Sequence, residues 1–123
     1  MIILTKIKIK ANLKNKNENH KYEGMGIKNK NVITYNDENV ITKVIFDNII
    51  TVERKKDYFL KIYFKEGINL EGEYITNYGK LKVDVYTKKL NIEKNNLKVI
   101  YDLKINNEYI DTFTYNLKYS IDT

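Results

Sequence analysis

The 123-residue sequence contains no cysteine, no proline, no tryptophan and a single histidine, His20. Without cysteine, disulfide bonds and thiolate catalysis are excluded. With one histidine, neither a histidine-rich metal site nor a catalytic histidine pair can form within one chain. His20 itself lies where a loop is expected to meet a strand, and we expect it to be exposed and without a catalytic role.

Long apolar runs are also missing. The first residues, MIILTKIKIKANL, are interrupted by Lys6, Lys8 and Lys10, whereas a signal peptide needs an unbroken apolar stretch of about 7–15 residues. No run approaches the roughly 18 apolar residues of a membrane helix. We therefore expect a cytoplasmic protein without a membrane partner.

The common signatures of catalysis and metal binding do not occur. The sequence has no glycine-rich phosphate loop, no Ser-His-Asp order and no zinc-ligand spacing. Glu71 and Glu73 share one face of an expected strand, where we expect solvated side chains rather than a glycosidase pair. The acidic residues of the expected turns do not form a calcium loop; they are Glu18, Asp37, Glu38 and Asp57. These absences favour a non-enzymatic role, with no cofactor and no metal.

Alternation of apolar and polar residues dominates the rest of the chain. After a turn at Tyr78-Gly79, the residues Leu81, Val83 and Val85 alternate with charged and polar ones, which gives a strand one apolar face. Similar patterns predict about ten strands, at residues 3–13, 20–27, 32–36, 40–46, 49–55, 58–65, 68–77, 80–90, 97–106 and 109–121. In residues 58–65 aromatic side chains occupy both faces, so the pattern does not decide which face is inward.

The links between these strands are too short for parallel crossovers, so neighbouring strands are expected to pair antiparallel. An up-and-down meander of this length removes its exposed edges by closing into a barrel. Gly24 and Gly26, on one face of a strand, fit the sharp bends that closure needs. We predict one all-β domain over residues 1–123, an antiparallel up-and-down barrel of about 8–10 strands.

A series of short segments resembles a known family in its order and spacing. The segments are Tyr22-Glu23-Gly24-Met25-Gly26, the lone Arg54, Phe64-Lys65-Glu66-Gly67, Tyr74 to Val83, Thr87-Lys88-Lys89-Leu90, and Val99 to Leu103. This series resembles the YwiB-like family of small bacterial proteins of unknown function over nearly the whole chain. The resemblance implies a lipocalin-like (calycin) barrel and no catalytic residues. The Gly-x-Trp signature of true lipocalins is absent, so their ligand chemistry is not carried over.

Arg54 is the one arginine beside 21 lysines, within 22 basic residues in all. A guanidinium offers a planar fork of five donors and stacks on aromatic rings, which lysine cannot do. Arg54 shares a strand face with Ile50 and Val52, so its head group is expected to be partly buried and to need a partner. Either it packs on a tyrosine and pairs with a carboxylate to close one barrel end, or it anchors an anionic ligand group inside the barrel.

Tyrosines provide the other candidate ligand contacts, since a phenol has an apolar body and a polar tip. We predict that the barrel interior binds a small, partly apolar ligand. The candidate residues are Arg54, Tyr22, Tyr63, Tyr74, Tyr101 and Tyr115. Such a barrel should contain a cavity of about 300 Å³ or more that reaches solvent, whereas tyrosines that merely fill the core would leave none.

The net charge of +6 has two interpretations. It can reflect residue usage in an AT-rich genome, which favours lysine, or it can mark a nucleic-acid partner. In the second case an outer face of lysines and a tyrosine would bind RNA or an RNA-containing assembly. The candidate residues are Lys6, Lys8, Lys10, Lys80, Lys82 and Tyr86. Lysines also protect sheet edges against aggregation, and the sequence does not decide between these roles.

Overall fold

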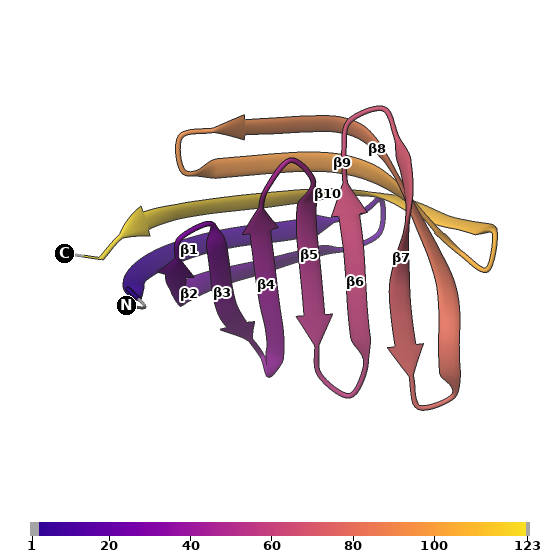
Figure 1. Cartoon of the computed structure of the whole chain (residues 1–123), viewed down its shortest axis with the longest axis horizontal. Coiled ribbons are helices and arrows are strands. Elements are labelled where there is room, and N and C mark those ends of the chain that lie inside the picture. The colour runs from indigo at the N-terminus through magenta and orange to yellow at the C-terminus, as the bar shows by residue number, and fades with distance from the viewer. Residues whose placement is uncertain (1–2, 123) are drawn as a thin grey trace.

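The computed structural model describes residues 3–122, and these form ten strands. Figure 1 shows them as a continuous meander. The strands are β1 (Thr5–Lys14), β2 (Asn19–Asn29), β3 (Val32–Asp37), β4 (Val40–Phe46), β5 (Ile50–Lys55), β6 (Phe59–Phe64), β7 (Asn69–Thr76), β8 (Gly79–Glu93), β9 (Asn96–Ile105) and β10 (Glu108–Ile121). The first predicted strand began at residue 3, but Ile3 and Leu4 lie exposed before β1.

Each strand pairs antiparallel with the next, and β1 pairs with β10 to close the barrel. The predicted all-β, antiparallel, up-and-down barrel is confirmed, with ten strands. In Figure 1 strands β3 to β7 cross those of β1, β2, β9 and β10 steeply, so the barrel resembles two packed layers. Within residues 3–122 no helix is long and apolar enough to cross a membrane.

Two register shifts interrupt the pairing of the long strands β8, β9 and β10. The register of β8 against β9 shifts between Thr87 and Lys89, and Figure 1 shows that β8 bends from one layer into the other. Such a bulge bends a strand and increases its twist. In β10 the register shifts between Tyr109 and Asp111. This shift leaves Tyr109 exposed and Asp111, two residues further along the strand, buried.

Close neighbouring atoms, mostly of side chains, explain the two glycines of β2. A Cβ atom on Gly26 would lie 2.2 Å from Ile9 Cδ1 and 2.8 Å from the Thr34 carbonyl oxygen. A Cβ atom on Gly24 would lie 2.5 Å from the hydroxyl of Tyr22. The absence of side chains at these positions therefore lets an isoleucine fill the barrel and a tyrosine lie flat along its own strand.

The interior is packed with aliphatic and aromatic side chains at the end that carries the β2–β3, β4–β5 and β8–β9 turns, which we call the filled end. The residues buried there and in the middle of the barrel are each at most 2% exposed: Ile7, Ile9, Ile33, Val44, Ile50, Val52, Ile62, Phe64, Leu97, Val99 and Leu117. The opposite end carries the β1–β2, β3–β4 and β5–β6 turns, and we call it the Arg54 end.

Candidate functional site

The interior position of Arg54 follows from strand register. Arg54 on β5 lies opposite Thr42 on β4 and Leu60 on β6. Thr42 lies opposite Tyr35 on β3, and Leu60 lies opposite Tyr74 on β7. Because side chains alternate along a strand, Arg54 points inward, one layer above the ring of Ile33, Val44, Val52 and Ile62. The guanidinium therefore caps the packed core.

Tyrosines surround this guanidinium. Its Cζ atom lies 5.2 Å from the centre of the Tyr115 ring, in cation–π geometry. The hydroxyls of Tyr115 and Tyr35 lie 2.6 Å apart and share a hydrogen bond. The Tyr35 ring in turn stacks on Tyr22, with centroids 5.0 Å apart. Arg54 also lies close enough to the Tyr101 and Tyr115 hydroxyls to act against the rise of their pKa values.

Arg54 has no anionic partner within residues 3–122, since none of the salt bridges found there includes it. Burial raises the pKa of Tyr115 well above its ordinary value, with a further rise from Tyr35 and a partial offset from Arg54. Burial likewise raises the pKa of Tyr101 and of Tyr35. At neutral pH these phenols are therefore uncharged, and they surround Arg54 without providing a counter-charge.

Burial acts to lower the pKa of Arg54, but Coulombic coupling to Tyr101, Tyr115 and Tyr35, which acts once these phenols ionise at alkaline pH, more than offsets this, and the net direction is upward. Arg54 is therefore a permanent cation. Its side chain is surrounded by protein atoms yet keeps part of its surface accessible. A desolvated charge without a counter-ion is unfavourable, and an anion that entered from solvent would relieve this.

A pocket of about 240 Å³ leads from solvent to Arg54. Its walls are mainly aromatic and aliphatic, with Tyr22, Tyr35, Tyr58 and Tyr115 among the rings. The volume is below the predicted 300 Å³, so the expectation of a large cavity was wrong: residues of the filled end occupy the rest of the interior. The pocket has room for about eight waters at ~30 Å³ each, which corresponds to a ligand of on the order of ten non-hydrogen atoms.

Charged side chains ring the entrance to this pocket. These charged side chains are Asp37, Glu38 and Lys56; together with the neighbouring His20 they form a group that we call the mouth. His20 Nε2 lies 2.7 Å from Asp37 Oδ2. His20, Asp37 and Glu38 each have one atom able to coordinate a metal ion, and these three atoms lie within 4.8 Å of one another. Glu38 and Asn39 form the β3–β4 turn with φ of 51° and 70°, the conformation of a tight hairpin turn. This turn fixes the position of Glu38 at the mouth.

The structure brings most of the predicted ligand residues together. Tyr22 and Tyr115 line the pocket with Arg54. Tyr101 lies deeper, fully buried between Phe64 and Phe113. Tyr74 does not line the pocket itself. Its ring contacts that of the pocket residue Tyr58 in a T-shaped arrangement, with centroids 6.2 Å apart.

Tyr63 does not belong to this cluster. On β6 the inward residues are Leu60, Ile62 and Phe64, so Tyr63 lies on the outer surface, where Lys61 Nζ lies 5.8 Å from its ring centre. Its placement in the interior was wrong because aromatic residues occupy both faces of this strand. Sequence reasoning also missed Tyr35 and Tyr58. The alternation of Ile33 with Tyr35 in β3 was the available signal for Tyr35.

The candidate lysines of the outer face are spread over two distant strands, since β9 and β10 separate β1 from β8. Acidic groups accompany most of them: Lys8 lies 4.0 Å from Asp122, Lys10 lies 3.7 Å from Glu23, and Lys80 lies 3.8 Å from Glu73. Lys82 lies within 4.0 Å of both Glu71 and Asp84. Glu71 and Glu73, expected to be merely solvated, thus accompany lysines.

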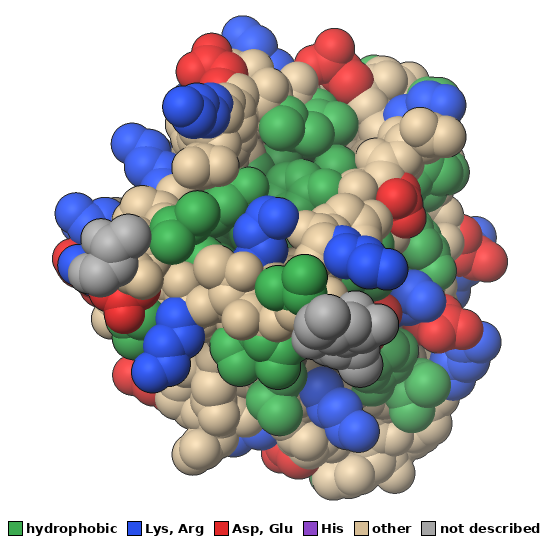
Figure 2. Space-filling model, turned by 60° about the vertical axis from the view of Figure 1, so that its left-hand side comes forward, with side chains coloured by type: hydrophobic (Ala, Val, Ile, Leu, Met, Phe, Trp, Pro, Cys, Tyr) green, Lys and Arg blue, Asp and Glu red, His purple; other side chains and the backbone are tan. Residues whose placement is uncertain are grey.

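The lysines of β1 adjoin a shallow outer groove of about 420 Å³ that is lined by Lys8, Lys10, Lys118 and Tyr119. Lys6 lies farther along β1, beside the exposed apolar residues Met25, Ile27 and Ile41. Tyr86 is 40% exposed but lies on β8, away from these lysines. In Figure 2 the basic side chains on the visible face lie among acidic and hydrophobic ones rather than in one stripe.

Comparison with known proteins agrees with this barrel. A family model described as "Domain of unknown function (DUF1934)" matches residues 2–117. The chain belongs to this family. The ywiB protein from Bacillus subtilis has a crystal structure similar to this chain, with a TM-score of 0.68 and 14% identity over 99% of this chain and 96% of that one. Among curated proteins none matches.

The resemblance to the YwiB-like family is thereby confirmed, and the structural neighbour supports the lipocalin-like barrel. At 14% identity this likeness concerns the fold alone. The family description assigns no activity, so the function has to be argued from the site, because unrelated functions occur on one fold.

Proposed function

We propose that this protein binds a small ligand with an anionic group in the pocket at the Arg54 end, without catalysing a reaction. The observation that carries the proposal is a cationic guanidinium that lines a pocket open to solvent, lies against neutral phenols and forms no salt bridge within residues 3–122. A carboxylate or phosphate on the ligand would supply the missing counter-charge through a bidentate hydrogen-bonded pair. The aromatic walls would contact an apolar body.

The pocket's size and chemistry define the test compounds. 4-Methylbenzoate has ten non-hydrogen atoms, a planar acid group and an apolar ring, and 4-methylbenzamide has the same shape without the charge. We expect calorimetry to show millimolar or tighter binding of the benzoate and weaker binding of the amide. A hydrogen-bonded contact with a charged group contributes about 1.5–3 kcal/mol, which corresponds to roughly a 10- to 100-fold difference in affinity.

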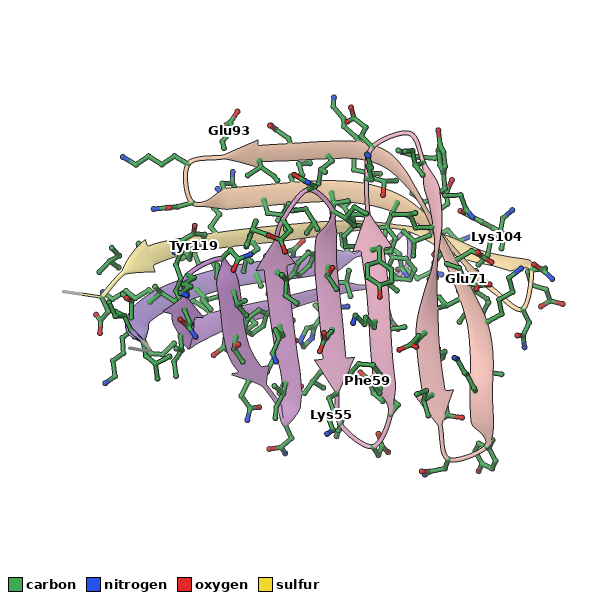
Figure 3. All side chains as sticks on the ribbon, in the orientation of Figure 1. Lys55, Phe59, Glu71, Glu93, Lys104 and Tyr119 are labelled. Atoms are coloured by element: carbon green, nitrogen blue, oxygen red, sulfur yellow. The ribbon has the colours of Figure 1, made fainter. Side chains whose placement is uncertain are left out.

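Variants locate the binding site. In Arg54→Met a side chain of similar length replaces the cation, and we expect affinity for 4-methylbenzoate to fall to that for the amide. Lys55→Met is the matched control, since it removes the same charge from the exposed neighbouring residue (labelled in Figure 3). Equal benzoate binding by wild type and Arg54→Met would contradict the proposal, as would equal binding of benzoate and benzamide.

The alternative hypothesis, an outer lysine face that binds RNA, has less support. Four of its five lysines lie beside carboxylates, and its lysines and Tyr86 do not share one surface. RNA binding of this kind weakens steeply as salt rises, because phosphate contacts release counter-ions. A salt-sensitive affinity for single-stranded RNA that Lys8→Met and Lys10→Met reduce would revive this hypothesis, and no such affinity would remove it.

A further inference from the structure

The Arg54 pocket combines charges of both signs, which is unusual for a simple anion site. Arg54 is at its inner end, and the mouth carries Lys56 together with the carboxylates of Asp37 and Glu38. The lining thus has two cations and two carboxylates. A ligand with one negative charge would meet a favourable charge at the inner end and unfavourable ones at the mouth.

Asp37 is held in place beside the pocket. Its side chain is only 15% exposed, and the His20 ring nitrogen 2.7 Å away fixes one carboxylate oxygen. Asp37 also acts on the Tyr35 hydroxyl, since it contributes to raising the pKa of Tyr35. Tyr35 is the same residue whose hydroxyl is bonded to Tyr115 beside Arg54. Opposite charges therefore lie at the two ends of the aromatic pocket wall. The Arg54 cation is at the inner end, and the Asp37 and Glu38 carboxylates are at the mouth.

We propose that the ligand is amphoteric: a compact molecule with an acid group at one end, an apolar body, and an amine or other cationic group at the opposite end. This inference rests on the proposed function. The acid would pair with Arg54, the ring or chain would contact Tyr22, Tyr35 and Tyr58, and the cation would meet Asp37 and Glu38. An α-amino acid, whose charges are adjacent, fits this separation less well than a molecule with a spacer between them.

Three probes of nearly identical shape test this charge pattern. 4-(Aminomethyl)benzoate carries both charges, 4-methylbenzoate only the acid and 4-methylbenzylamine only the amine. We expect 4-(aminomethyl)benzoate to bind about two- to fivefold more tightly than 4-methylbenzoate, which corresponds to the contribution of one ion pair at the mouth. 4-Methylbenzylamine should bind least. EDTA in all samples keeps stray divalent ions away from the three clustered donor atoms at the mouth.

Variants at the mouth provide the decisive comparison. Combining Asp37→Asn with Glu38→Gln should reduce the affinity ratio of 4-(aminomethyl)benzoate to 4-methylbenzoate to about one, while 4-methylbenzoate still binds and so reports an intact pocket. Glu38→Gln alone, which leaves the His20–Asp37 pair, should reduce the ratio in part. Glu93→Gln is the control, since Figure 3 places Glu93 at the distant β8–β9 end.

A ratio of one or less in wild type would overturn this inference, and so would a ratio that the double variant leaves unchanged. In both cases binding of 4-methylbenzoate would leave the proposed function standing. If instead wild type bound none of the three probes, the proposed function and this inference would fall together.

Discussion

The two ends of the barrel interior are built from the same alternating strands but differ in what the inward positions carry. At the filled end, β3, β4, β5 and β6 contribute Ile33, Val44, Val52 and Ile62, which are at most 2% exposed. One layer further, the same strands contribute Tyr35, Thr42, Arg54 and Leu60. The first layer is buried, whereas the second borders a pocket.

This difference indicates a division of roles. Aliphatic side chains pack densely and provide the free energy of folding through burial. The guanidinium of Arg54 among phenols contributes less to the free energy of folding, because the cost of desolvating its charge offsets part of the free energy gained from its contacts. Substitutions at the filled end should therefore affect stability, and substitutions at the Arg54 end should affect binding.

The largest expected effect is on the filled end. Phe64 is 1% exposed, and Phe64→Ala should lower the free energy of unfolding by about 3–5 kcal/mol, because it leaves a cavity. Phe59→Ala makes the same change on the outer side of β6, near the β5–β6 turn (Figure 3). It should cost about 1 kcal/mol or less. Urea denaturation measures both, and similar losses would contradict the division.

The second-largest effect is expected at alkaline pH, which should destabilise the Arg54 end. Burial raises the pKa of Tyr115, Tyr35 and Tyr101 above the value of about 10 that they have when unfolded. The folded state then holds protons that the unfolded state releases. Stability is complete below pH ~10 and falls above it, by about 1.4 kcal/mol per pH unit for each such tyrosine.

Spectrophotometric titration at alkaline pH, together with denaturation at each pH, measures this effect. If all eleven tyrosines ionised together in the folded protein, the burial of these hydroxyls would be contradicted.

Removal of one hydroxyl from the Tyr35–Tyr115 pair has a smaller effect. Tyr35→Phe deletes the partner of a buried hydrogen bond of 2.6 Å, and we expect a loss of about 0.5–1.5 kcal/mol. Tyr86→Phe, on an exposed tyrosine, is the matched control and should leave stability unchanged. A neutral result for Tyr35→Phe would indicate that water replaces the missing hydroxyl.

The smallest effect on stability is expected for Arg54→Met. The variant loses a cation–π contact, a contribution of about 0.5–2 kcal/mol, but it also removes a poorly solvated charge. We expect the free energy of unfolding to change by no more than about 1 kcal/mol. A loss comparable to that of Phe64→Ala would mean that Arg54 is a structural residue, and the sequence-based interpretation of an end-closing arginine would then be preferred.

Alternation alone was enough to predict the barrel, because a strand with one apolar face has to bury it and short turns impose antiparallel neighbours. It also placed Arg54 inward, through the phase of Ile50 and Val52. It failed where the period breaks, as at the β10 shift next to Asp111, and where both faces are aromatic, as at Tyr63.

The mouth could not be predicted at all. His20, Asp37 and Lys56 are far apart in the sequence, and barrel closure and strand register bring them to one entrance. The missing counter-ion of Arg54 was equally invisible, because it depends on which of the 16 acidic residues come near it in space.

The lone arginine permits one direct test of the account. In an NMR titration with 4-methylbenzoate, Arg54 contributes the only arginine side-chain Nε–Hε resonance of the chain. We expect this resonance to shift and saturate together with the amide resonances of Tyr35 and Thr42, while those of Val44 and Val52 stay in place. Saturable binding that leaves the Arg54 resonance unmoved, or that shifts the filled end equally, would contradict it.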